Sequence, residues 1–142
     1  MSAFEHRQSA HCESGVMASL LSQAGLPMSE PMAFGLASGL AFAYLPIVKL
    51  GGMPLIAYRM PPRHLIKTLS KRLGVRLSSR TFSNPEQGRR ALDEALDSGR
   101  LVGLQSSVFW LPYFPPEMRF HFNAHNLLAY GREGDDYLLS DP

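Results

Sequence analysis

An uncharged run of seventeen residues, at positions 32–48, sets the first limit on how this chain can fold. Its length is at the lower end of what spans a membrane, and Pro46 interrupts its final part. Gly35 and Gly39 follow a small-residue spacing that lets another backbone approach closely. Ser29 precedes the run as a typical helix N-cap. We therefore predict a buried helix that packs on other helices, and no membrane span.

Helix and strand signals alternate through the rest of the chain. Apolar residues at helical spacing, with capping residues and closing glycines, predict further helices at residues 12–25, 62–74 and 84–99. Apolar runs predict strands at residues 54–60, 75–82 and 101–110, and a final hairpin at 125–142 that turns at 132–135. Helices first and strands last predict an α+β fold in which N-terminal helices pack on a mostly antiparallel sheet.

Composition excludes several classes of protein. The 142 residues are enough for a single domain, 1–142, and a net charge of +2 is too small to indicate nucleic-acid binding. One cysteine allows no internal disulfide, and the polar start has no secretion signal, so we expect a cytoplasmic protein. Because the chain reaches Pro142 just after the apolar residues Tyr137, Leu138 and Leu139 of a predicted strand, with no closing element, we also expect this domain to be the N-terminal part of a longer protein.

The only cysteine, Cys12, lies at the predicted start of the first helix. Unpaired backbone N–H groups at a helix N-terminus favour negative charge, which would favour a thiolate nucleophile. The alternative is a buried cysteine that acts as a small apolar side chain. Two nearby polar residues, Gln8 and His11, could contribute to an oxyanion site or support the thiol.

Two residues of the final hairpin could complete a catalytic triad with Cys12. His125 opens the first apolar strand and could act as the base, whereas Asp141 ends the second strand and could orient the imidazole. His121 lies four residues earlier and competes with His125 for this role. Cysteine and histidine together could also bind zinc, but the chain has no paired-cysteine metal motif, so we expect no metal.

This order of residues resembles papain-like cysteine enzymes. The closing stretch HNLLAYGREGDDYLLSDP also resembles bacteriocin-processing double-glycine peptidases. The segments HCESG, EPMAFGLASGLAFAYLP, LPY and HNLLAYG…LLSDP are, in this order, similar to motifs of the N-terminal domain family of butirosin biosynthesis protein H.

The resemblance implies a papain-like fold and an acyltransferase of secondary metabolism, with Cys12, His125 and Asp141 in the catalytic positions. Such an enzyme takes an acyl group from the phosphopantetheine thioester of an acyl carrier protein, forms an acyl-cysteine and passes the group to a small amine. No bound cofactor is expected.

Two departures from the peptidase pattern bear on the alternatives. Gln8 is only four residues before Cys12, closer than the peptidase glutamine, and Glu13 stands where those peptidases often have glycine. These differences weaken the peptidase interpretation more than the acyltransferase one. A cysteine peptidase of the double-glycine type remains the first alternative, and a non-catalytic module that binds a carrier protein or a ligand is the second.

Two groups of side chains are candidates for substrate and partner binding. Aromatic residues could wall an acyl pocket, or could be core at the edge of the sheet: Phe42, Tyr44, Trp110 and Tyr113. Three cations follow the outer face of the helix at 62–74 and could dock an acidic carrier protein, or form an ordinary solvated surface: Arg63, Lys67 and Lys71.

Overall fold

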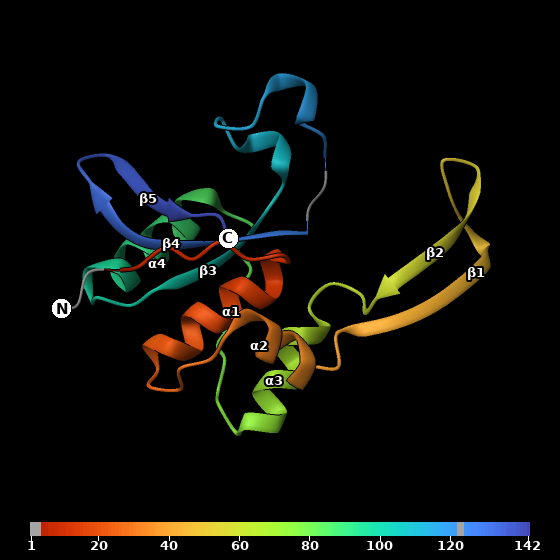
Figure 1. Ribbon diagram of the computed structural model, residues 1–142. Coiled ribbons are helices and arrows are strands. Elements are labelled where there is room, and N and C mark those ends of the chain that lie inside the picture. Colours follow the sequence, from red (N-terminus) through yellow and green to blue (C-terminus); the bar gives the residue numbers. More distant parts are fainter. Residues whose placement is uncertain (1–3, 122–123) are drawn as a thin grey trace.

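The computed structural model describes residues 4–121 and 124–142. Within these ranges the helices are α1 (Cys12–Gln23), α2 (Glu30–Leu36), α3 (His64–Leu73) and α4 (Pro85–Asp97). The strands are β1 (Leu40–Leu50), β2 (Met53–Arg59), β3 (Val102–Ser106), β4 (His125–Glu133) and β5 (Asp136–Ser140). They form two antiparallel sheets, β1–β2 and β3–β4–β5 (Figure 1). The predicted α+β class is confirmed.

Three helices pack together in the first part of the domain. Their shared core contains Met17 and Leu21 of α1, Ala33 of α2, and Leu65 and Leu69 of α3, each at most 2% exposed. The apolar face predicted for α3 is therefore the buried one. The cations predicted on its other side are exposed.

The three-stranded sheet is covered on both faces. Consecutive residues of the central strand β4, Leu127, Leu128 and Ala129, are all buried, although neighbouring side chains of a strand point to opposite faces. Helix α1 packs against one face, where Gly103 of β3 lies against Val16. Figure 1 shows α1 in front of this sheet and α4 behind it.

The run at residues 32–48 does not form the single buried helix that its apolar sequence predicted. Ser29 caps α2 as expected, but the helix ends at Leu36 and the chain continues as β1. Ser38 adopts a left-handed φ of 52°, and the N–H of Gly39 donates to the carbonyl of Phe34, which closes the helix end. The rest of the run pairs with β2 in an exposed hairpin.

Two other predicted strands differ from the structure. Residues 75–82 form no strand, because Val75 and Leu77 pack against the helical core instead of pairing with another strand. The strand predicted at 101–110 ends at Ser106 and is followed by a single 3₁₀ turn at Val108–Trp110. None of the described helices combines the length and the apolar character needed to cross a membrane.

Candidate active site

Cys12 is the first residue of α1, as predicted, and its side chain is partly buried. The ring of His11 caps this helix, because its Nδ1 accepts a hydrogen bond from the backbone N–H of Ser14 at 3.3 Å. Burial, and then the positive charge of Arg59, lower the pKa of His11 below its ordinary 6.5. A neutral ring suits the cap, since Nδ1 must keep a free lone pair to accept.

His125 and Asp141 come together at the open end of the β4–β5 hairpin. His125 begins β4 and Asp141 directly follows β5, so antiparallel pairing brings them to the same end. The Nε2–H of His125 donates to both carboxylate oxygens of Asp141 at 2.9 Å. The side chains are only 16% and 22% exposed. The carboxylate therefore holds the ring in one orientation and favours the tautomer with the proton on Nε2.

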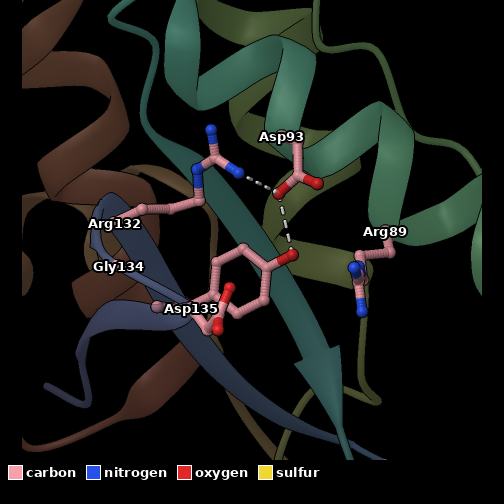
Figure 2. Close-up of a pocket in the computed structure, with 6 residues that line it drawn as sticks. Arg89, Asp93, Arg132, Gly134 and Asp135 are labelled. Atoms are coloured by element: carbon pink, nitrogen blue, oxygen red, sulfur yellow. Dashed lines mark hydrogen bonds and ion pairs between the residues drawn. The ribbon is translucent and has the colours of Figure 1, made fainter.

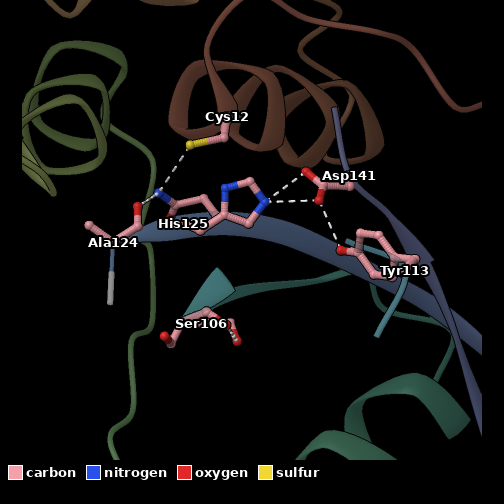
Figure 3. A network of polar contacts seen from close by, with 8 residues as sticks. Cys12, Ser106, Tyr113, Ala124, His125 and Asp141 are labelled. Atoms are coloured by element: carbon pink, nitrogen blue, oxygen red, sulfur yellow. Dashed lines mark hydrogen bonds and ion pairs between the residues drawn. The ribbon is translucent and has the colours of Figure 1, made fainter. Parts of the chain in front are cut away.

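Tyr113 extends this pair from the loop after β3. Its hydroxyl donates to Oδ2 of Asp141 at 2.8 Å (Figure 3). Burial, followed by the hydrogen bond to Asp141, raises the pKa of the phenol well above its ordinary value. Tyr113 is thus a hydrogen-bond donor to Asp141, which limits the movement of that carboxylate.

The thiol of Cys12 lies beside β4, the strand that begins with His125. The side-chain amide of Asn126, the residue after His125, lies 3.8 Å from the Cys12 sulfur. Figure 3 shows the second ring nitrogen of His125 pointing toward α1, from which Cys12 extends. Among the described residues no hydrogen bond joins Cys12 to His125. Such bonds are often long before substrate binds.

Gly15 lets the end of the chain approach α1. A Cβ added at this position would lie 2.6 Å from the Ser9 hydroxyl oxygen and 2.9 Å from the side chain of Pro142. A larger residue here would push the segment at Pro142, and with it Asp141, away from the helix that carries Cys12. The glycine of the HCESG segment thus has a steric role in assembling the site.

Glu13, which follows Cys12, connects two helices. Its side chain is buried, and its carboxylate accepts the backbone N–H groups of Arg63 at 3.1 Å and Ile66 at 3.3 Å. These donors belong to the start of α3, where a helix favours negative charge. A glycine at position 13 could not make this connection.

The structure does not bring every predicted site residue to Cys12. Gln8 is exposed, and in the described part of the chain it forms no hydrogen bond with the thiol. His121 is also exposed and stacks on Phe109 with ring centroids 4.1 Å apart, so His125 is the histidine that holds Asp141.

The four predicted pocket aromatics do not form one wall. Phe42 and Tyr44 lie on β1, 74% and 56% exposed, because residues 40–48 form a hairpin instead of a buried helix. Trp110 is 70% exposed and lies edge-on to Phe109. Only Tyr113 reaches the site.

Two features of the site were missed at the sequence level. The contact of Asn126 with Cys12 had one local signal, its position directly after His125. The hydrogen bond from Tyr113 to Asp141 spans 28 positions and had no local signal. Both depend on how the loop and the sheet pack against α1.

A separate polar pocket lies at the other end of the β4–β5 hairpin, next to α4 (Figure 2). There Asp93 accepts a hydrogen bond from Tyr137 at 2.8 Å and pairs with Arg132 at 3.3 Å. These contacts attach α4 to the sheet. In the described part of the chain, no three histidine, cysteine or acidic side chains are grouped so as to hold a metal ion.

The structure thus places a thiol at the start of a helix beside a histidine–carboxylate pair at one end of the β4–β5 hairpin. Residues 11–142 match the family described as Butirosin biosynthesis protein H, N-terminal. Because this match covers nearly the whole chain, the chain belongs to that family. Searches of curated proteins and of solved structures found no significant match.

Proposed function

We propose that this domain is a thiol-dependent acyltransferase with a papain-like arrangement of Cys12, His125 and Asp141. The observation that supports it most is the 2.9 Å hydrogen bond of His125 with Asp141, next to Asn126, which contacts Cys12 from the same strand as His125. The description of its family supports a role in biosynthesis, here of a secondary metabolite.

Each member of the triad has a defined task in this proposal. Asp141 binds Nε2–H of His125, which leaves the other ring nitrogen free to take the thiol proton of Cys12. The thiolate attacks the carbonyl carbon of the donor thioester. The new bond joins the Cys12 sulfur to the acyl carbon, the bond to the donor sulfur breaks, and His125 returns the proton to the leaving thiolate.

The second half of the reaction consumes the acyl-cysteine. An amine attacks the acyl carbon, the bond to Cys12 breaks, and His125 transfers the amine proton to the departing thiolate. Exchange between two thioesters is nearly balanced in free energy, whereas amide formation is downhill. The backbone N–H of Cys12, at the start of α1, would stabilise the oxyanion in both steps.

The acyl donor in this proposal is the phosphopantetheine thioester of an acidic carrier protein. The charge distribution supports such a partner, since residues 31–85 contain eight lysines and arginines and no aspartate or glutamate. Arg63, Lys67 and Lys71 are exposed in this segment and would meet the carrier.

The direct test is to incubate the protein with a panel of acyl-carrier thioesters and to search for an adduct by intact mass. We expect an acyl group on the wild type, none on Cys12→Ser, and loss of the adduct when an amine acceptor is added. No adduct, together with cleavage of a peptide substrate, would instead establish the peptidase alternative.

A second test measures activation of the thiol without any substrate. Alkylation of Cys12 by iodoacetamide should stay fast near pH 6, where an ordinary thiol is almost fully protonated, and His125→Ala should slow it. Alkylation that is slow at pH 6 and unaffected by His125→Ala would favour a non-catalytic binding module.

A further inference from the structure

The amide of Asn126 is a buried polar group that the triad does not use. The residue is 6% exposed, and its Nδ2 lies 3.0 Å from the carbonyl oxygen of Ala124 as well as 3.8 Å from the sulfur of Cys12. A buried amide is retained only where its hydrogen bonds compensate for the loss of water. The contact with the thiol therefore needs an explanation.

The contact with Ala124 fixes which end of the amide faces the thiol. The carbonyl oxygen of Ala124 can only accept a hydrogen bond, so the NH₂ group of Asn126, and not its oxygen, must face Ala124. The same NH₂ group faces Cys12. One N–H serves Ala124, and the other is directed to Cys12. A hydrogen bond to a neutral thiol is weak, but the same donor is much more effective toward a negative charge.

We propose that Asn126 is a catalytic residue whose side-chain amide stabilises the negative charge that passes from the Cys12 sulfur to the acyl oxygen. The carbonyl oxygen of an acyl group on Cys12 lies only two bonds from the sulfur, within reach of a donor at 3.8 Å from it. This inference rests on the acyltransferase function proposed above.

The position of Asn126 on β4 supports Asn126, and not Gln8, as the side chain that donates to the acyl oxygen. His125 and Asn126 are consecutive, so one strand supplies both the base and the side-chain donor to the thiol. Gln8 is exposed and does not contact Cys12 among the described hydrogen bonds. In the peptidase pattern a glutamine before the cysteine supplies the side-chain donor, whereas here Asn126 of β4 would supply it.

The test compares two reactions of Cys12, only one of which forms an oxyanion. The acylation rate constant is measured with an acyl-pantetheine thioester, which needs no carrier docking, and alkylation is measured with iodoacetamide. For Asn126→Leu, which keeps the branching at Cγ and removes the donor, we expect acylation to fall by about 10²–10³-fold. Alkylation, which forms no oxyanion, should fall no more than a few-fold.

Two further variants make the result specific. Asn126→Ser keeps a hydroxyl donor and should recover part of the acylation rate; it also serves as the test variant if Asn126→Leu does not fold. Gln105→Leu removes an exposed side-chain amide from the residue of β3 paired with Asn126, and both of its rates should equal those of the wild type.

Three outcomes would overturn the inference. Equal losses of acylation and alkylation in Asn126→Leu would show a structural role, unchanged acylation would show no role, and a loss confined to Gln8→Ala would assign the donor to Gln8. In all three the wild type still forms its acyl adduct. If the wild type itself is alkylated but never acylated, the proposed function fails, and this inference fails with it.

Discussion

The two antiparallel sheets of this chain have similar apolar sequences and opposite environments. Leu127 in the three-stranded sheet is 1% exposed, whereas Ile47 in the β1–β2 hairpin is 94% exposed. Figure 1 shows the hairpin extending away from the helices, while α1 and α4 cover the other sheet. An apolar run thus predicts the tendency to form regular structure, but not whether another element covers it.

The largest effect should come from the core that α1, α2 and α3 share. Leu69 of α3 is fully buried, so Leu69→Ala should lower the free energy of unfolding by about 2–5 kcal/mol through lost burial and the remaining cavity. Urea unfolding followed by circular dichroism would measure this. A change below about 0.5 kcal/mol, the range of an ordinary surface substitution, would contradict the assignment of the core.

A smaller loss is expected where a buried charge connects two helices. Glu13→Ala removes the acceptor for two backbone N–H groups at the start of α3 and should reduce stability by about 1–3 kcal/mol. Glu13→Gln keeps one side-chain oxygen and should lose less. The exposed Glu94 of α4 is a control, and a similar loss in Glu94→Ala would refute the role of the buried contacts.

Arg59, at the end of the β1–β2 hairpin, should affect the pKa of His11 at the start of α1. Because the folded state holds the pKa of His11 below 6.5, the unfolded chain binds more protons at mildly acidic pH. The stability contributed by His11 is therefore complete above pH 6.5 and decreases as the pH falls toward the folded pKa. Arg59→Gln should raise the pKa of His11, though not fully, because burial is the larger cause.

This shift can be followed by NMR titration of the His11 ring. The exposed Arg90 of α4 provides a matched loss of charge, and Arg90→Gln should leave the titration unchanged. An identical His11 pKa in wild type and Arg59→Gln would mean that the β1–β2 hairpin is not electrostatically coupled to the start of α1.

The smallest effect should be in the hairpin itself. Ile47→Ser removes an apolar side chain that is already in water, so the free energy of unfolding should change by no more than about 0.5 kcal/mol. The same urea titration applies. A loss comparable to that of Leu69→Ala would show that the hairpin is packed in solution, and would abolish the contrast between the two sheets.

Local signals predicted much of the fold and the core of the candidate site. Caps at Ser29 and Asn84, the apolar face of α3 and the turn of the last hairpin all follow from neighbouring residues. The positions of Cys12, His125 and Asp141 at the ends of elements were predictable for the same reason. Antiparallel pairing of β4 with β5 then brings the last two together.

The family was already indicated by the resemblance of four sequence segments to its motifs. Capping and periodicity, which act over a few residues, were enough to predict the α+β order and the helix that carries Cys12. Three features could be seen only in the folded chain: β1 is an exposed strand, His125 and not His121 binds Asp141, and Asn126 faces the thiol. These outcomes depend on which distant surfaces pack together. Packing of this kind is set by the sum of many contacts across the chain, which no single segment contains.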